Sequence, residues 1–215
     1  MHILIEYASL FRDGFLATIA LFLLSGVGSL VLGTVLAMLR VSPVPVFRTA
    51  GTLYVTVIRN TPLTLVFVFF VFAYPLLEIV QLSFFQAATV ALTVYTSAFV
   101  CEVVRSGINT VPLGQAEAAR ALGLSFPQVL GQVVLPQAMR SVAPPMISTL
   151  IALLKNTTIA AGFSVAEAGR IRSVLSDNGE NQLVGLAWVS AGFVVLVLLL
   201  SLVQRTLEKR WSVSL

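Results

Sequence analysis

The sequence predicts an all-α membrane protein with five transmembrane helices. Hydrophobic residues make up 58% of the chain and charged residues 10%, and the mean hydropathy is +0.98. In soluble domains roughly a quarter of the residues are charged, so this composition indicates that lipid is the main solvent. Five apolar stretches approach the roughly 20 helical residues that cross a hydrocarbon core. Helices suit this solvent because they satisfy their backbone hydrogen bonds internally.

The predicted spans follow one another along most of the chain. They cover residues 14–39, 61–77, 82–101, about 145–163 and 183–203. The second is short and could take in residues 55–58. Apolar residues at helical spacing in 3–11 predict an interfacial helix before the first span. We therefore expect an extracellular interfacial helix at 1–13, a membrane domain at 14–210 and a cytoplasmic tail end at 211–215.

The orientation follows from the lysine and arginine residues outside the spans. One side would carry nine of them, namely Arg40, Arg48, Arg59, Arg105, Arg120, Arg140, Arg205, Lys209 and Arg210. The other side would carry three, namely Arg12, Arg170 and Arg172. Cytoplasmic loops are enriched in these residues, which predicts an extracellular N-terminus and a cytoplasmic C-terminus. The loop at 112–135, between the third and fourth spans, would then lie in the cytoplasm.

Several kinds of chemistry lack the residues that they need. Cys101 is the single cysteine and His2 the single histidine, so the chain offers neither a disulfide nor a Cys or His cluster for a metal. The phosphate-binding run G-x-x-x-x-G-K-[ST] is missing as well. The net charge of +4 is modest and gives no sign of nucleic-acid binding. We expect no metal, no bound cofactor and no catalytic residue on this chain.

The first span carries small residues at every fourth position. This small-residue stripe consists of Ser25, Ser29, Gly33 and Ala37. Helices in lipid associate mainly through van der Waals contact, and small side chains let them approach closely. The stripe therefore predicts close packing, either inside the bundle or against a partner subunit.

The loop at 112–135 is longer than a turn between two spans requires. Pro112 is placed to open a helix, and residues 114–122 are mostly good helix formers. Gly123 suits the left-handed residue that commonly ends a helix. The first half of the loop therefore predicts a short helix followed by a tight glycine turn.

The second half of the loop predicts another short helix. Ser125 and Gln128 have the spacing of a capping box, and Pro136 would help to stop the helix. The two helices would form a compact knob with small alanine faces, suited to the groove of another protein. A connector that merely lies on the membrane surface is the alternative.

Polar residues occur at membrane depth, where they are costly and usually face the interior of a bundle. The fourth span contains the run Lys155, Asn156, Thr157 and Thr158. Lys155 lies ten residues beyond Pro145, roughly 15 Å along a helix, which would place it near the middle of the bilayer. The structural alternative is a lysine paired with a carboxylate such as Glu102.

A similar polar cluster stands at the start of the second span. It consists of Arg59, Asn60, Thr61 and Thr64, and Arg-Asn-Thr echoes Lys-Asn-Thr. We take both clusters as candidate substrate-pathway residues, although Arg59 could instead anchor the cytoplasmic end of its span. Candidates of lower rank on the third span are Thr93, Thr96 and Ser97, because threonines in membrane helices often bond only their own backbone.

The loop resembles the EAA loop of ABC-importer permeases in Glu117-Ala118-Ala119 followed by Gly123. Permeases for the uptake of polar amino acids are especially similar in GQAEAARALGLSFPQVLGQVVLPQAMR at 114–140, and also in RNTPLTLV at 59–66, YTSAFVCEVVRSGINTVPLGQ at 95–115 and LIALLKNTTIAA at 150–161. The resemblance covers nearly the whole chain in the expected order. With RVSPV at 40–44 and KNTT at 155–158, it is most similar to actinobacterial glutamate permease subunits.

The resemblance implies a type I ABC importer permease fold, in which this loop is the coupling helix that docks on a cytoplasmic ATPase. The coupling residues would be Gln115, Glu117, Ala118, Ala119, Arg120 and Gly123. The resemblance also implies two ATPase subunits that hold ATP and Mg, and a second permease that is a different but related chain. An extracellular amino-acid-binding protein would complete the importer in a bacterial plasma membrane. This chain would provide half of the pathway and leave the chemical step to the ATPase.

The charges near the predicted pathway indicate the substrate class. Lys155 and Arg59 offer cations, and the predicted spans contain no Asp or Glu. Many relatives have Lys-Asp-Thr where this chain has Lys155-Asn156-Thr157, so an anion common in the resembling family is missing. A second carboxylate is then less costly to bring into low dielectric. We expect an acidic substrate, glutamate before aspartate, with glutamine or another polar amino acid as the alternative and basic amino acids disfavoured.

Two other functional classes fit the sequence less well. An ion-coupled secondary transporter usually has carboxylates within its spans, and the predicted spans have none. A structural subunit without a pathway would not need Lys155 and three polar residues at mid-membrane. An ATP-driven import permease is therefore the function that the sequence favours.

Overall fold

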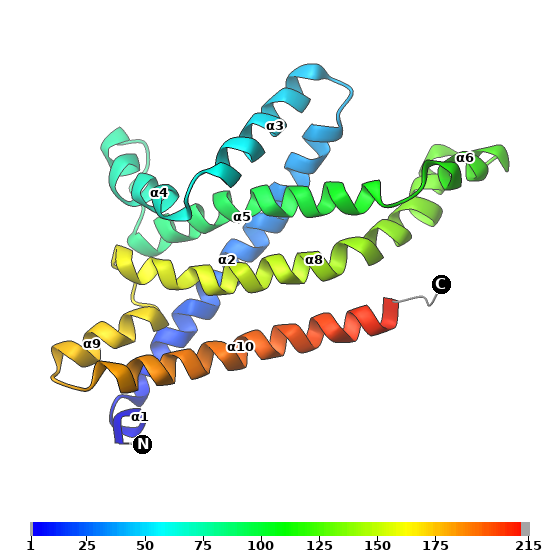
Figure 1. The fold of residues 1–215 in the computed structure, drawn as a ribbon. Coiled ribbons are helices and arrows are strands. Elements are labelled where there is room, and N and C mark those ends of the chain that lie inside the picture. The colour runs from blue at the N-terminus through cyan, green and yellow to red at the C-terminus, as the bar shows by residue number, and fades with distance from the viewer. Residues whose placement is uncertain (1, 212–215) are drawn as a thin grey trace.

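The computed structural model describes residues 2–211, and every regular element in that range is a helix (Figure 1). The long helices are α2 (Ala8–Val41), α3 (Pro45–Asn60), α5 (Phe84–Asn109), α8 (Leu135–Asn156) and α10 (Gln182–Trp211). The short α-helices are α1 (His2–Glu6), α4 (Leu63–Val68), α6 (Leu113–Ala121), α7 (Phe126–Gln128) and α9 (Ile171–Asp177). Two π-helical turns, η1 (Phe69–Ala73) and η3 (Val129–Val134), and three 3₁₀-helices, η2 (Tyr74–Leu77), η4 (Thr157–Phe163) and η5 (Ala168–Arg170), complete the fold.

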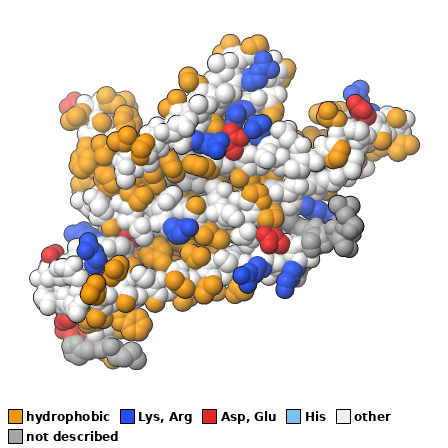
Figure 2. All heavy atoms as spheres, viewed as in Figure 1, with side chains coloured by type: hydrophobic (Ala, Val, Ile, Leu, Met, Phe, Trp, Pro, Cys, Tyr) orange, Lys and Arg blue, Asp and Glu red, His pale blue; other side chains and the backbone are white. Residues whose placement is uncertain are grey.

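The long helices form one bundle. α5, α8 and α10 lie in a row, and α2 crosses α5 and α8 obliquely, with its main contact on α5 (Figure 1). α3 folds back beside the end of α2 and contacts α5. The N-terminal helix α1 lies at one end of the bundle, and α6 and the end of α10 lie toward the other. Figure 2 shows hydrophobic side chains over much of the surface, as expected for helices in lipid.

Four helices in the described residues are long and apolar enough to cross a membrane. They are α2, α5, the continuous helix Phe126–Phe163 and α10. A fifth span results if α3 and the helical segment Leu63–Leu77 count together, although they are bent by 106°. The predicted all-α fold is confirmed, and the second predicted span falls on this bent pair.

The break in the second span has a local cause. Thr61 is extended, with φ −95° and ψ 131°, because the ring of the following proline disfavours the α-helical conformation there. Pro62 also has no N–H to continue the hydrogen-bond ladder. Residues 55–58, which could lengthen this span, belong to α3 on the other side of the bend, so they extend it only if the bent pair counts as one span.

The first span begins earlier than predicted. α2 is continuous from Ala8, and Tyr7 separates it from α1 with φ −104° and ψ 25°. The segment 3–11 therefore divides between two helices, and the predicted boundary at residue 13 lies inside α2. Its position at a membrane surface stays a prediction. Of the tail end at 211–215, only the backbone of Trp211 belongs to the described residues.

The fourth span also begins earlier, and the prediction that Pro136 stops a helix is wrong. Helix continues from Phe126 through η3 into α8. At the end of η3 the Leu135 N–H donates to the carbonyl of Leu130, five residues back. This wider π turn accommodates the next residue, Pro136, which has no N–H to donate. The depth of Lys155 cannot be counted from Pro145, because the helix does not start there.

The small-residue stripe packs inside the chain, against α5. All four of its residues are buried. A Cβ added to Gly33 would lie 2.5 Å from Val100 Cγ1 and 2.7 Å from the carbonyl oxygen of Ser97. The Ser29 hydroxyl donates to the Ser25 carbonyl at 2.6 Å and reaches the Thr93 carbonyl of α5 at 3.4 Å. Close packing of the stripe is confirmed, and its partner is a helix of the same chain.

Candidate functional site

The first predicted polar cluster lies where α3 ends. Asn60 is the last residue of α3 and Thr61 its C-cap. The Asn60 amide donates to the Thr56 carbonyl at 2.7 Å, and the Thr61 hydroxyl donates to the Val57 carbonyl at 2.9 Å. Both side chains therefore satisfy carbonyls that the end of a helix leaves without N–H partners. Arg59 instead extends toward α5.

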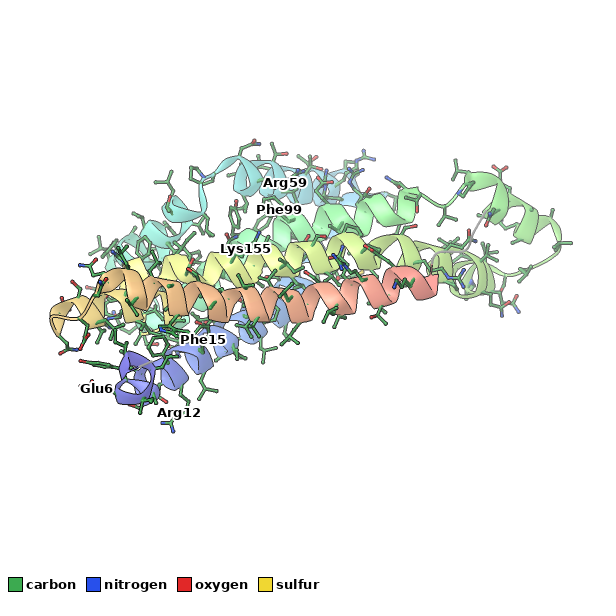
Figure 3. All side chains as sticks on the ribbon, turned by 60° about the horizontal axis from the view of Figure 1, so that its bottom comes forward. Glu6, Arg12, Phe15, Arg59, Phe99 and Lys155 are labelled. Carbon is green, nitrogen blue, oxygen red and sulfur yellow. The ribbon has the colours of Figure 1, made fainter. Side chains whose placement is uncertain are left out.

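Arg59 belongs to a charged cluster around Glu102 of α5. This Glu102 cluster consists of Glu102, Arg40, Arg59 and Arg105. Arg105 Nη2 donates to Glu102 Oε2 at 2.9 Å, Arg40 Nη1 donates to Oε1, and Arg59 Nη1 lies 3.3 Å from Oε1. Figure 3 shows Arg59 beside Phe99, and its guanidinium carbon is 5.6 Å from that ring centre. The cluster joins the ends of α2 and α3 to α5.

The second predicted polar cluster lies where α8 changes into a 3₁₀-helix. Asn156 is the last residue of α8, and Thr157 is its C-cap, just as in the triplet at the end of α3. The Thr157 hydroxyl is buried and donates to the Leu154 carbonyl at 2.7 Å, while Thr158 donates to the carbonyl of Lys155 at 2.8 Å. The echo between the two triplets therefore corresponds to one structural position, a helix end with a cation in its last turn.

Lys155 is not paired with Glu102, so that alternative is wrong. The described ion pairs of Glu102 are all to arginines. Within the described part of the chain the Lys155 ammonium has no hydrogen bond or ion pair, and its side chain is exposed. Figure 3 shows Lys155 on α8, in the middle of the row of long helices.

Lys155 lines a cavity of about 470 Å³, which we call the Lys155 cavity. It lies between the end of α8, α9 and α10. Its polar lining consists of Lys155, Arg172, Thr158 and Ser190, and its apolar wall includes Leu186 and Phe193. No carboxylate is among its described lining residues. Two cationic side chains, two hydroxyl groups and an apolar wall thus line the cavity.

Sequence reasoning missed two residues of this cavity. Arg172 was assigned only to an outer loop, and Ser190 was not singled out. The tight connection at Gly179, where φ is +78°, folds α10 back beside α9 and brings both residues next to Lys155. A glycine between two helical segments indicates such a reversal, but not which side chains then face α8. Asn156 is not among the residues that line the cavity.

The lower-ranked candidates on α5 belong to the packed core. Thr96 and Ser97 are buried, and the Ser97 hydroxyl bonds the Val94 carbonyl at 2.8 Å and the Tyr54 hydroxyl at 3.0 Å. The Thr93 hydroxyl donates to the Thr89 carbonyl at 2.7 Å. Two of these bonds stay within α5 and the one to Tyr54 joins it to α3, and all three side chains lie outside the Lys155 cavity.

A buried carboxyl that the sequence did not reveal lies between η4 and η5. Glu167 Oε2 accepts a hydrogen bond from the Thr18 hydroxyl at 2.9 Å, and Oε1 accepts one from the Gly169 N–H at 2.7 Å. Burial raises the pKa of Glu167 to about 7, because desolvation outweighs these hydrogen bonds. The group joins this connection to α2 and shares a cavity of about 350 Å³ with Asp13 and Arg170.

The knob, residues 112–135, has the turn and cap that its sequence predicts. Gly123 has φ +85°, the left-handed conformation. The Ser125 N–H donates to Gln128 Oε1 at 2.8 Å in a complete capping box. Gln137 of α8 donates to the side chain of Gln115 and ties α6 to the base of the knob. The second helix differs from the prediction, because it continues into α8.

The exposed surface of the knob is less alanine-rich than predicted. Glu117, Ala118 and Arg120 are exposed, but Ala119 is buried inside the knob. Three large apolar side chains are also exposed, namely Leu113 at 81%, Leu122 at 83% and Phe126 at 74% exposure. Sequence reasoning singled out none of these three side chains. Figure 1 shows the knob extending beyond the other helices, where these side chains can reach another protein.

Residues 29–213 match the family model described as "Binding-protein-dependent transport system inner membrane component", and the chain belongs to this family. It is therefore the permease subunit of an ABC importer. A permease subunit is not itself an enzyme, and the ATPase is a separate partner chain.

Amino-acid permeases are similar over nearly the full length of the chain. The glutamate transport system permease protein GluC of Corynebacterium efficiens is 42% identical over 214 residues, with 93% of each chain covered. GluC of Corynebacterium glutamicum is 41% identical with the same coverage. The probable glutamine ABC transporter permease protein GlnM of Bacillus subtilis is 36% identical, covering 99% of this chain and 98% of GlnM.

Solved structures share the fold. The crystal structure of an amino acid ABC transporter with histidines superposes with a TM-score of 0.90 at 26% identity, covering 96% of each chain. An inward-facing structure of the MetNI methionine ABC transporter has a TM-score of 0.79 at 23% identity, covering 97% of this chain and 99% of that one. The type I ABC importer permease fold is thereby confirmed.

Proposed function

We propose that this permease imports an acidic amino acid, glutamate before aspartate, and that Lys155 and Arg172 bind its two carboxylates. The observation that carries the proposal is the Lys155 cavity, with two cations and no carboxylate among its described lining residues. The glutamate permeases of two corynebacteria, at 42% and 41% identity, favour the same substrate.

The charges of the cavity discriminate between amino acids. Glutamate brings two carboxylates, which the two cations neutralise, while the Thr158 hydroxyl oxygen can still accept a hydrogen bond and the Ser190 hydroxyl also lines the cavity. Glutamine brings one carboxylate and leaves one cation without a partner. Arginine would add a third cation in a region of low dielectric, where like charges repel strongly. This order makes glutamine the alternative substrate and basic amino acids the disfavoured ones.

The test is uptake of labelled glutamate, glutamine and arginine by the complete importer in proteoliposomes. Lys155→Met and Arg172→Met should each lower glutamate uptake at least roughly tenfold, the loss of one charge-assisted hydrogen bond. Arg205→Met, which removes a cation on α10 outside the cavity, is the matched control and should transport normally. A wild-type preference for arginine, or glutamate uptake that neither cavity variant changes, would refute the proposal.

The orientation and partners form part of the same proposal. The N-terminus would face outside and the C-terminus the cytoplasm of a bacterial plasma membrane, as the nine-to-three split of cations indicates. The partners would be a second, related permease, an extracellular amino-acid-binding protein and two ATPase subunits that hold ATP and Mg. The similarity of this chain to both GlnM and GlnP of Bacillus subtilis supports a paired permease.

The knob would couple this subunit to its ATPase. Three of the predicted coupling residues would maintain the shape of the knob. Gln115 is hydrogen-bonded to Gln137, Ala119 is buried, and Gly123 has the left-handed conformation of the turn. The exposed polar residues Glu117 and Arg120, with Ala118, would contact the ATPase together with Leu122 and Phe126. The apolar side chains would contribute most of the binding free energy, since fully burying one large apolar side chain is worth about 1.5–3 kcal/mol.

A further inference from the structure

We propose a second anion-binding site on the α6 side of Lys155, in a cavity of about 340 Å³ that Arg59 and Arg105 line. It would bind a carboxylate of the transported amino acid after that molecule leaves the Lys155 cavity. The chemistry of the ligand rests on the proposed function, whereas the existence of an anion site rests on the charges and geometry of the Glu102 cluster.

The cavity has a surplus of hydrogen-bond donors. Two guanidinium groups line it, together with the hydroxyls of Ser106, Thr110 and Ser141. Its one carboxylate, Glu102, is already engaged by three arginines. The Glu102 cluster therefore has three cations for one anion, and an entering carboxylate would reduce the repulsion among them. The volume of the cavity is within the range of small-molecule sites.

Arg59 is the cation that an entering anion can recruit. Arg40 and Arg105 both donate hydrogen bonds to Glu102, whereas Arg59 only approaches it, at 3.3 Å. Side-chain exposure follows the same order, at 14% for Arg40, 36% for Arg105 and 45% for Arg59. Arg59 can exchange its contact with Glu102 for one with the substrate without breaking the hydrogen bonds that join α2 to α5.

The two sites are separate and lie on different sides of α8. The Lys155 cavity lies between the end of α8, α9 and α10, whereas Ser141 and Pro145 line the second cavity together with residues of α3 and α5. Pro145 precedes Lys155 by ten residues, roughly 15 Å of helix toward the α6 end, so a carboxylate that moves toward the knob would pass from the α10 side of α8 to its α5 side before it meets Arg59. Competition by Glu102 would keep the binding weak enough for release.

The test is equilibrium binding of labelled glutarate, a dicarboxylate without an ammonium group, and of labelled glutamate to the complete importer in nanodiscs. Every sample carries Lys155→Met, so that the first site is disabled, and contains neither nucleotide nor binding protein. Adding Arg59→Met should weaken glutarate binding roughly tenfold or more. Adding Glu102→Gln should tighten it several-fold, because the competing carboxylate is gone. A purely structural cluster would give no such gain.

Arg48→Met is the matched control, since Arg48 is another α3 arginine that lines a different cavity. It should leave glutarate binding unchanged. Binding that does not depend on Arg59 would overturn the inference, even if Glu102→Gln fails to fold. Glutarate binding in neutral-lipid nanodiscs that anionic phosphatidylglycerol abolishes would assign the cations to a lipid phosphate and also overturn it. Arg59-dependent glutarate binding without glutamate uptake by the wild type would support the anion site and reject the proposed substrate.

Discussion

Glu167→Gln should remove a pH dependence from the stability of this protein. The carboxyl is buried, and its pKa is raised from the ordinary value of 4.5 to about 7. The folded state therefore holds a proton that the unfolded chain releases above about pH 4.5. The contribution to stability is fully present below pH 4.5 and is lost as the pH rises through about 7. The difference between the two pKa values corresponds to about 3 kcal/mol.

The geometry explains why glutamine is a suitable replacement. The Gly169 N–H can still donate to the side-chain oxygen, as it does to Oε1 of Glu167 at 2.7 Å. The new amide can donate to the Thr18 hydroxyl oxygen, while that hydroxyl donates to the Gly14 carbonyl at 3.1 Å. Asp13 and Arg170 are the other charged groups that face the same cavity, and both remain in the variant.

The assay is thermal unfolding of the purified importer between pH 5 and pH 8. Wild type should lose stability across this range, by up to roughly 6–12 °C for about 3 kcal/mol in a chain of this size. Glu167→Gln should be flat in comparison and more stable than wild type at pH 8. Glu78→Gln, at an exposed carboxyl, is the control and should follow wild type. A pH slope in Glu167→Gln equal to that of wild type would refute the reasoning.

Three further variants test packing, coupling and substrate. Gly33→Ala should destabilise the protein by about 1–3 kcal/mol through overpacking, whereas Gly26→Ala, whose added Cβ has 3.7 Å of room, should unfold at or above the wild-type temperature. Equal unfolding temperatures would contradict the close α2–α5 contact. Gly123→Val should abolish uptake and ATPase stimulation while leaving the membrane helices folded, because a β-branched residue resists the left-handed conformation at φ +85°. Normal uptake and ATPase stimulation in this variant would contradict the coupling role of the knob. Asn156→Asp should lower glutamate uptake more than glutamine uptake, since it adds an anion next to Lys155, and equal effects on both substrates would argue against charge selection.

Features that depend on neighbouring residues could be predicted from the sequence. Three such features depend only on residues close together in the sequence, and the structure confirms them. They are the capping box at Ser125, the left-handed Gly123 and the small-residue stripe. The continuation of the helix past Pro136 could not be predicted, because proline normally ends a helix and only the π turn before it removes the conflict.

Features that depend on tertiary contacts were out of reach. Arg172 lines the same cavity as Lys155 only because α10 folds back beside α9. In the sequence the two residues lie in different segments. The sequence allows Glu102 as a partner for Lys155. Glu102 instead forms ion pairs with three arginines, from α2, α3 and α5, and these pairs depend on how the three helices pack.

The two basic-Asn-Thr triplets, at 59–61 and 155–157, show why a motif alone does not define a transport site. Each triplet ends an α-helix, where polar side chains bond the last carbonyls and a cation is stabilised by the helix dipole. Helix termination thus explains the shared composition without any substrate. The surroundings differ, because Arg59 lies against a carboxylate and Lys155, within the described residues, has none. A cation on a membrane helix without its own anion is costly, so this cost, together with the second cation across the cavity, favours a role in transport for Lys155.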